Sequence, residues 1–234
     1  MKKTEAIDKP VRYGCDFCKA TFLREKTTLS HICEGKHRWL ERDRQGNRIG
    51  FQAWLQFYKK NMAGNKNRTY EEFIKNAYYT AFAKFGLYCV GVNCINVGRF
   101  SDWLLKNQIK IDNWCQDSNY TKFLCEYIRS EDPVDAITRS IKTTMLNAEE
   151  EHIQSRDYLR YGNTNKICLD VTRGKISPWM LYQSDSGVAC LSSMRSDQQG
   201  MIIDYINPEL WKIKFNREPE NVKQVKELLN AGGY

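Results

Sequence analysis

The feature that most restricts how this chain can fold is a cluster of cysteines and histidines near its N-terminus. Two residues separate Cys15 from Cys18, twelve separate Cys18 from His31, and five separate His31 from His37. A two-residue gap lets two thiolates converge on one ion at a tight turn, and twelve residues suffice for a return strand and a helix carrying an imidazole. Two thiolates and two imidazoles suit tetrahedral zinc. The spacing therefore predicts a zinc site within residues 13–38.

The sequence leaves the fourth ligand open. Gly35 lies between the two histidines and would loosen a helix there, whereas Cys33 and His37 are separated by three residues and would suit a helical pair. His37 is the first choice and Cys33 its competitor. Unmetallated core thiols are an alternative interpretation of the cysteines, as is a redox C-x-x-C, although no βαβ pattern surrounds the pair.

The segment resembles a classical C2H2 zinc finger. Tyr13 lies two residues before the first cysteine, and Phe22 follows Cys18 after three residues, although Thr28 stands where the family has a core leucine. The resemblance covers about 26 residues and implies a ββα fold. It also implies that the finger helix turns three side chains toward base edges: Arg24, Thr27 and Ser30. The whole chain is similar to uncharacterised zinc-finger proteins of tailed bacteriophages, a resemblance that implies no function.

Positive charge is concentrated in the first third of the chain. Residues 1–68 contain 16 Lys and Arg against 7 Asp and Glu, a net charge of +9, whereas residues 69–234 contain 20 against 21, a net charge of −1. Such an uneven division indicates a polyanionic partner, and we expect nucleic acid, DNA rather than RNA. Arginines that follow the finger can neutralise phosphates. The predicted nucleic-acid contacts are Arg24, Thr27, Arg38, Arg42, Arg44 and Arg48.

Four segments are expected along the chain: a flexible lead-in over 1–12, the zinc finger over 13–38, a basic and aromatic connector over 39–68, and a helical body over 69–234. Aromatic residues at helical spacing in the connector are expected to pack as core against the body. This aromatic stripe consists of Phe51, Trp54, Leu55 and Tyr58.

The predicted fold class is mainly α, a ββα finger followed by an all-α body that contains at most one short hairpin. Thr69 and Glu72 form a capping box that begins a helix expected to stop at Gly86. Further helices are expected behind capping residues followed by proline, at Asp132-Pro133, Ser177-Pro178 and Asn207-Pro208, and a last helix runs from Pro219. Two segments have the β-branched character of strands, Leu87–Val92 and Ile167–Val171.

Catalytic signals in the body are weak. Glu149 and His152 have the spacing of a carboxylate-bridged metal site, but no second copy follows. Four aspartates could gather a divalent ion in a nuclease, yet they also resemble helix caps: Asp112, Asp117, Asp132 and Asp135. Phosphate-binding glycine loops and nucleophile elbows are absent from the sequence. We therefore assign no catalytic residue, and the interpretation leans away from an enzyme.

The remaining sequence patterns bear on where in the cell the protein is found. The sequence has no apolar run of membrane-spanning length and no apolar segment behind its two N-terminal lysines, so a cytosolic protein is expected, in the host cytosol if a phage encodes it. Nine irregularly spaced cysteines also fit a reducing compartment.

Three functions are consistent with these patterns. The first is a zinc-finger protein that binds nucleic acid and docks a partner through its helical body. The second is a zinc-stabilised protein–protein interaction or structural protein of the virion or its assembly. The third is a divalent-metal nucleic-acid enzyme.

Overall fold

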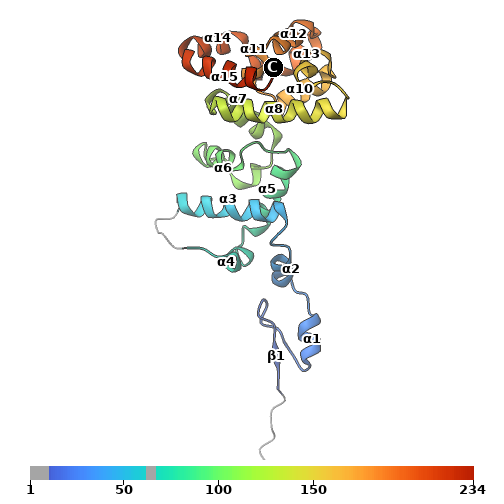
Figure 1. Cartoon of the computed structure of the whole chain (residues 1–234). Helices are drawn as coiled ribbons and strands as arrows, with labels where there is room; N and C mark the ends of the chain where they lie inside the picture. Colours follow the sequence, from blue (N-terminus) through green and yellow to red (C-terminus); the bar gives the residue numbers. More distant parts are fainter. Residues whose placement is uncertain (1–10, 62–66) are drawn as a thin grey trace, which may run out of the picture. The chain divides into compact units, whose positions relative to one another are not determined.

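The computed structural model describes residues 11–61 and 67–234 (Figure 1). Within these residues a two-stranded antiparallel hairpin is followed by helices alone, which confirms the mainly α fold. The chain divides into two compact units, Met1–Val90 and Gly91–Tyr234. None of the helices in the described residues combines the length and the apolar character needed to cross a membrane. The predicted lead-in lies almost wholly outside the described residues.

The first unit contains the hairpin and the first helices. Its elements are β1 (Tyr13–Gly14), β2 (Thr21–Phe22), α1 (Glu25–Ser30), α2 (Glu34–Leu40), α3 (Gln45–Asn61), α4 (Tyr70–Ile74) and α5 (Tyr79–Gly91). The second unit is helical throughout its length. Its elements are α6 (Val97–Lys106), η1 (Ile111–Asn113), α7 (Asp117–Ser130), α8 (Pro133–Glu150), η2 (Ser155–Asp157), α9 (Tyr158–Tyr161), α10 (Thr164–Thr172), α11 (Pro178–Gln183), α12 (Asp185–Ser193), α13 (Ser196–Ile206), α14 (Pro208–Arg217) and α15 (Pro219–Ala231).

Helices α3 and α5 of the first unit approach each other at glycines. A Cβ atom on Gly50 would lie 2.5 Å from the carbonyl oxygen of Phe82, and one on Gly86 would overlap the carbonyl oxygen of Gly46. Only residues without a side chain permit two helix backbones to come so close. The expected helix stop at Gly86 was therefore wrong, because this glycine lies inside α5 and serves packing.

The aromatic stripe of α3 packs into the core of the first unit. Trp54 is fully buried, and its ring lies 5.3 Å from that of Phe73 in α4. Phe51 contacts Tyr70 edge-on at 5.2 Å, and the Tyr58 hydroxyl accepts a hydrogen bond from the Asn76 amide at 2.9 Å. Residues 51–58 thus pack against residues 70–76, as expected of core.

The helix predicted to begin at Thr69 is shorter than expected. The Thr69 hydroxyl accepts a hydrogen bond from the backbone N–H of Glu72, which confirms the cap. The chain then leaves the helix at Lys75, because the Asn76 carboxamide oxygen accepts from the backbone N–H of Tyr78 at 2.8 Å and fixes a turn. Two helices, α4 and α5, therefore replace the single predicted one.

In the second unit, the three predicted capping residues that stand before prolines are confirmed. The side chains of Asp132, Ser177 and Asn207 each accept a hydrogen bond from a backbone N–H two or three residues further on, at the starts of α8, α11 and α14. Helix α8 packs against α9, α11 and α15 (Figure 1). The indole rings of Trp179 and Trp211 meet edge-to-face at 5.9 Å in the core.

The two strand-like segments are helical. Residues 87–91 form the last turns of α5, and residues 167–171 lie within α10, which the Asn163 side chain caps. In α10 the buried positions Ile167, Cys168 and Val171 follow helical spacing, while Leu169 is exposed. The β-branched composition was misleading because burial of one helical face determines the local structure.

Candidate metal centre

The hairpin positions the first two cysteines. Tyr13 pairs with Phe22, and Gly14 with Thr21. Beyond the strands, the backbone N–H of Cys15 donates to the carbonyl oxygen of Ala20 at 2.8 Å, and the chain turns back through Lys19, whose φ of 60° is left-handed. This tight turn brings the side chains of Cys15 and Cys18 to the same end of the hairpin.

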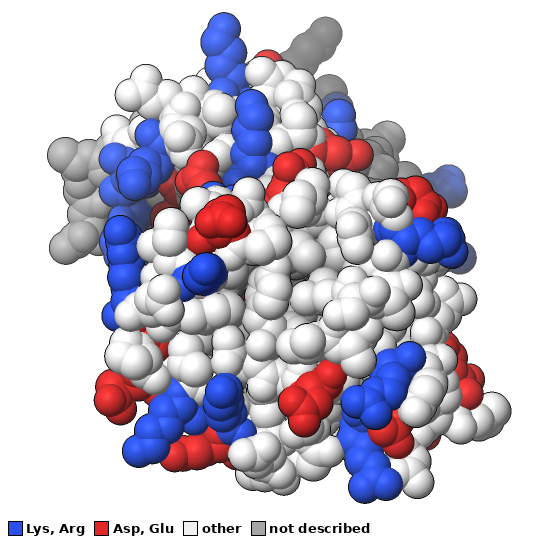
Figure 2. Space-filling view, turned by 90° about the horizontal axis from the view of Figure 1, so that it is seen from above, with Lys and Arg blue, Asp and Glu red and all other residues white. Residues whose placement is uncertain are grey.

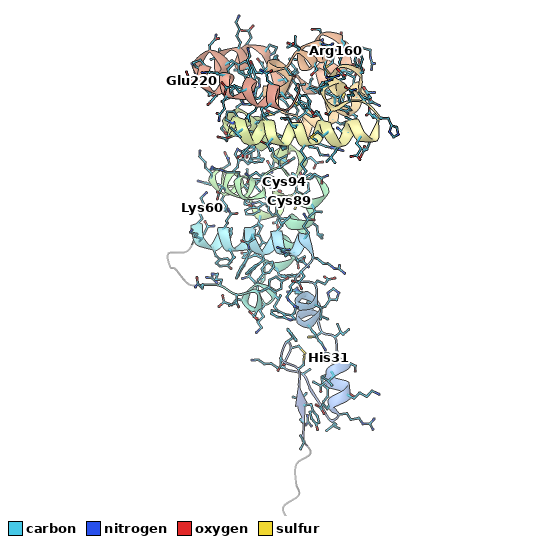
Figure 3. The ribbon with its side chains drawn as sticks, viewed as in Figure 1. His31, Lys60, Cys89, Cys94, Arg160 and Glu220 are labelled. Carbon is cyan, nitrogen blue, oxygen red and sulfur yellow. The ribbon has the colours of Figure 1, made fainter. Side chains whose placement is uncertain are left out.

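Helix α1 positions His31, which caps its C-terminus. The backbone N–H of His31 donates to the carbonyl oxygen of Thr27 at 3.0 Å, and its ring lies 4.9 Å from that of Phe22 on the second strand. The imidazole is therefore held between the helix end and the hairpin, where Figure 3 labels it.

Cys33 is the N-cap of α2. Its sulfur accepts a hydrogen bond from the backbone N–H of Lys36 at 3.4 Å. Helix α2 passes close to the turn between the first two cysteines, because a Cβ atom on Gly35 would lie only 3.3 Å from the Cβ atom of Phe17. The capping position turns the Cys33 thiol toward that turn.

These elements bring four donors together. The ligand atoms of Cys15, Cys18, His31 and Cys33 all lie within 4.8 Å of one another, and this is the one group able to hold a metal among residues 11–61 and 67–234. The sulfurs of Cys15 and Cys33 are 3.9 Å apart, and the Cys18 sulfur is 3.3 Å from the His31 Nε2.

The donor spacing fits zinc. Tetrahedral zinc with sulfur at about 2.3 Å and nitrogen at about 2.0 Å holds two sulfurs about 3.8 Å apart, and a sulfur and a nitrogen about 3.5 Å apart. The observed separations of 3.9 and 3.3 Å agree with that arrangement. Three thiolates and one imidazole are also a ligand set that zinc prefers.

The thiols have different proton affinities. Backbone N–H groups of Cys18 and Phe17 donate to the Cys15 sulfur and lower the pKa of this thiol. The backbone N–H of Ala20 also acts to lower the pKa of Cys18, but desolvation and the neighbouring Cys15 and Cys33 thiols outweigh it, so that pKa is raised. Without a cation, three adjacent thiolates would repel one another, and a divalent ion removes that repulsion.

The structure places His37 outside this group. Its imidazole Nε2 lies 3.6 Å from a carboxylate oxygen of Glu41, and its side chain is 61% exposed. The chain between Ser30 and Glu34 is not helical, so His31 and His37 do not share one helix as they would in a C2H2 finger. Cys33, the competitor in the sequence, occupies the fourth position of the donor group instead.

Some side chains predicted to contact nucleic acid are engaged within the first unit, and others are exposed to solvent. Arg38 is engaged within the first unit, where its guanidinium donates to the carbonyl oxygen of Ile74 at 2.7 Å, pairs with Glu34 and lies 4.3 Å from the Tyr79 ring centre. Arg42 lies over the Trp39 ring at 4.8 Å. Both arginines therefore contribute to packing.

The side chains of the other predicted contact residues are exposed to solvent. Arg44 is 71% exposed, although it pairs with Glu41 at 2.7 Å. The side chains of Arg24 and Arg48 are exposed and make no ion pair or hydrogen bond with the described residues. Thr27 is exposed on α1. The structure thus presents several cationic groups but does not gather all of the predicted ones into a single site.

The carboxylates considered for catalysis are dispersed. Asp132 caps α8, and Asp112, Asp117 and Asp135 lie in the first turns of their own helices. All four are exposed, as are Glu149 and His152, and none joins a metal-binding group in the described part of the chain.

The fold and the site together define a helical protein with an N-terminal hairpin that can bind a metal ion. Comparison with models of known protein families, with curated proteins and with solved structures finds no match to this chain. Its function therefore has to be inferred from the chemistry of the site.

Proposed function

We propose that Cys15, Cys18, His31 and Cys33 bind one zinc ion that holds the N-terminal segment in its fold. The convergence of the four donors within 4.8 Å is the observation that carries this proposal. Four protein ligands leave no open coordination position, so the ion is structural and not catalytic. Zinc supplies the cross-link between hairpin, α1 and α2 that this segment lacks, since α1 and α2 contain no buried residue.

We further propose that the zinc-stabilised first unit binds nucleic acid through phosphates. Residues 1–90 contain 18 Lys and Arg against 9 Asp and Glu, a net charge of +9. Arg24, Arg44 and Arg48 expose their guanidinium groups, and Arg42 and Thr27 add weaker contacts. Such contacts position a duplex without reading its sequence, so the binding is largely insensitive to sequence.

The test is a titration of the full-length protein with mixed-sequence duplex DNA at several salt concentrations, with zinc content determined on the same sample. If four or five cations meet phosphates, the plot of log affinity against log salt has a slope of about −4. Replacing Arg24, Arg44 and Arg48 together by glutamine should flatten that slope by up to about 3 units.

A matched control replaces three exposed cations of the second unit, Arg160, Arg173 and Lys223, by glutamine. The control carries the same change in net charge, so it should leave the slope almost unchanged. Equal losses in the two triple variants would show that net charge, not the first unit, governs binding.

A specific observation favours a second function, a zinc-stabilised module that binds protein. Four large apolar side chains of the finger and α2 are exposed: Leu23, Leu29, Ile32 and Leu40. An apolar surface of this kind is typical of protein–protein contact. A flat salt dependence, or no binding of DNA near physiological salt, would favour this function.

We also propose that the protein works in a reducing cytosol, that of the host if a phage encodes it. The nine cysteines are irregularly spaced and odd in number, which does not fit a disulfide framework. Zinc coordination by thiolates is stable where disulfides do not form.

A further inference from the structure

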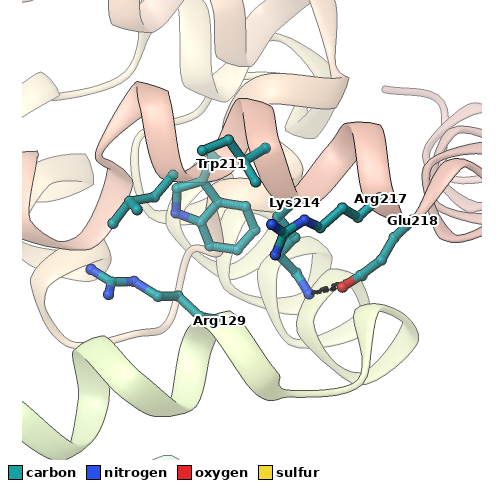
Figure 4. Close-up of a pocket in the computed structure, with 7 residues that line it drawn as sticks. Arg129, Trp211, Lys214, Arg217 and Glu218 are labelled. Atoms are coloured by element: carbon teal, nitrogen blue, oxygen red, sulfur yellow. Dashed lines mark hydrogen bonds and ion pairs between the residues drawn. The ribbon is translucent and has the colours of Figure 1, made fainter.

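The second unit contains a hollow of about 280 Å³ between the end of α7 and helix α14. Figure 4 shows its lining, in which Trp211 lies between three basic side chains. The residues that line it are Arg129, Leu210, Trp211, Ile213, Lys214, Arg217 and Glu218. This hollow lies in a different unit from the proposed zinc site.

The floor of the hollow is apolar and fixed in position. Trp211 is almost fully buried, and its indole N–H donates to the carbonyl oxygen of Tyr205 at 3.0 Å. Leu210 and Ile213, one turn of α14 apart, are 42% and 47% exposed at the rim. An apolar side chain placed here would cover carbon atoms that now face water.

The charges around this floor are unbalanced. Lys214 donates to both carboxylate oxygens of Glu218, at 2.7 and 2.8 Å, so these two charges neutralise each other. Among residues 11–61 and 67–234, Arg129 donates only to the carbonyl oxygen of Asp204, at 3.3 Å, and Arg217 makes no ion pair or hydrogen bond. Neither guanidinium group beside the apolar floor is paired with a carboxylate of the described residues.

We propose that this hollow binds an acidic segment of a partner protein, with an apolar side chain against Leu210 and Ile213 and carboxylates on Arg129 and Arg217. Planar guanidinium groups suit carboxylates because they donate two parallel hydrogen bonds. This occupant matches both halves of the lining, the apolar floor and the unpaired cations.

Nucleic acid fits the hollow less well. Residues 91–234 contain 18 Lys and Arg against 19 Asp and Glu, a net charge of −1. Figure 2 shows that, in the view down onto the C-terminal helices, basic and acidic groups alternate around an uncharged centre. A phosphate backbone could pair with the arginines, but it offers no apolar group for the floor, whereas an acidic peptide can supply both.

The experiment is calorimetric titration of the full-length protein with a hexapeptide of two central leucines flanked on each side by two glutamates. Three control ligands are titrated in parallel: the peptide with glutamines for glutamates, the peptide with alanines for leucines, and a single-stranded hexanucleotide. We expect the acidic leucine peptide to bind and each altered peptide to lose about fivefold or more in affinity.

Single arginine variants test whether the peptide binds in this hollow. Arg217→Gln and Arg129→Gln should each weaken the acidic leucine peptide about fivefold, whereas Arg160→Gln should not. Arg160 is an exposed arginine of α9 that lies far across the second unit from Glu220 of α15, as Figure 3 shows. Thermal unfolding of each variant confirms that it is folded.

Three results would overturn the proposal. The first is no heat of binding with millimolar acidic leucine peptide. The second is equal weakening by all three arginine variants. The third is tighter binding of the hexanucleotide than of the peptide, lost in Arg217→Gln, which would assign the hollow to phosphate.

Discussion

Replacing the two candidates for the fourth zinc ligand, one at a time, distinguishes the proposed ligand set from that of a C2H2 finger. The two variants are Cys33→Ser and His37→Ala. In the structure the Cys33 sulfur lies 3.9 Å from that of Cys15, whereas the His37 side chain is 61% exposed and faces Glu41. The first exchange therefore removes a donor of the group, and the second removes only an exposed contact with Glu41.

The expected magnitudes differ widely. Structural zinc contributes about 10–16 kcal/mol of apparent binding free energy at neutral pH, so one of four ligands contributes about 3 kcal/mol. Loss of that amount raises the zinc dissociation constant by about two orders of magnitude. The exposed pair of His37 with Glu41 contributes about 0–1 kcal/mol, so His37→Ala should change the constant by less than about fivefold.

Zinc affinity is measured by competition with a chromophoric chelator, and cobalt substitution supplies an independent reading. Thiolate-to-cobalt charge transfer should fall by about a third in Cys33→Ser, because two of three thiolates remain, and should be unchanged in His37→Ala. If His37→Ala weakened zinc binding more than Cys33→Ser, the assignment of Cys33 would be refuted and the C2H2 ligand set restored.

Three further predictions concern packing. Gly86→Ala should destabilise the protein by about 3 kcal/mol or more in denaturant unfolding, because its methyl group would overlap the backbone of α3; an unchanged midpoint would contradict the close approach of α3 and α5. Trp39 lies outside the donor group but packs on Phe17, between the first two cysteines, so Trp39→Ala should lower zinc affinity, whereas the matched Trp103→Ala in the second unit should not; equal affinities in the two variants would contradict coupling between α2 and the proposed zinc site. Arg139→Met should cost about 3–5 kcal/mol at neutral pH, because it strands the fully buried Glu131 carboxylate. Burial already raises the pKa of Glu131, and loss of the guanidinium raises it further, so this variant should regain stability as the pH falls toward the ordinary value of a glutamate. A deficit that stays constant as the pH falls would refute that explanation.

The starts of the helices could be predicted because their signals are local. Asp132, Ser177 and Asn207 each cap a helix through a backbone N–H two or three residues away, and the following proline is compatible with the first turn. Three members of the group that could hold a metal were predicted for the same reason. Cys15, Cys18 and His31 are positioned by one hairpin and one short helix, whose lengths the sequence spacing already limits.

The incorrect predictions concern contacts between distant segments. Nothing near Gly86 in the sequence shows that Gly46 will lie against it, so the glycine was read as a helix stop. The choice of the fourth donor also depends on a contact between segments that are separate in the sequence. The chain leaves the helix after Ser30 and starts a new one at Glu34, which turns Cys33 into a cap that faces the first cysteines and leaves His37 on the outer side of α2. Gly35 was the one sequence signal of this break. A glycine stands there because α2 passes close to Phe17, a tertiary contact that the local sequence does not reveal.

The proposed zinc site and the aromatic core of the first unit are parts of one packed structure. Phe17, between the first two cysteines, contacts Trp39 of α2 at 6.3 Å, and Trp39 meets Tyr70 of α4 at 5.9 Å. Tyr70 in turn packs on Phe51, whose neighbour Trp54 is fully buried. A cut at Thr69 would therefore separate Trp54 from Phe73 and expose both, whereas a division after Val90 keeps this aromatic series intact. Since the series begins beside the proposed zinc ligands, we expect metal removal to loosen the packing as far as α4.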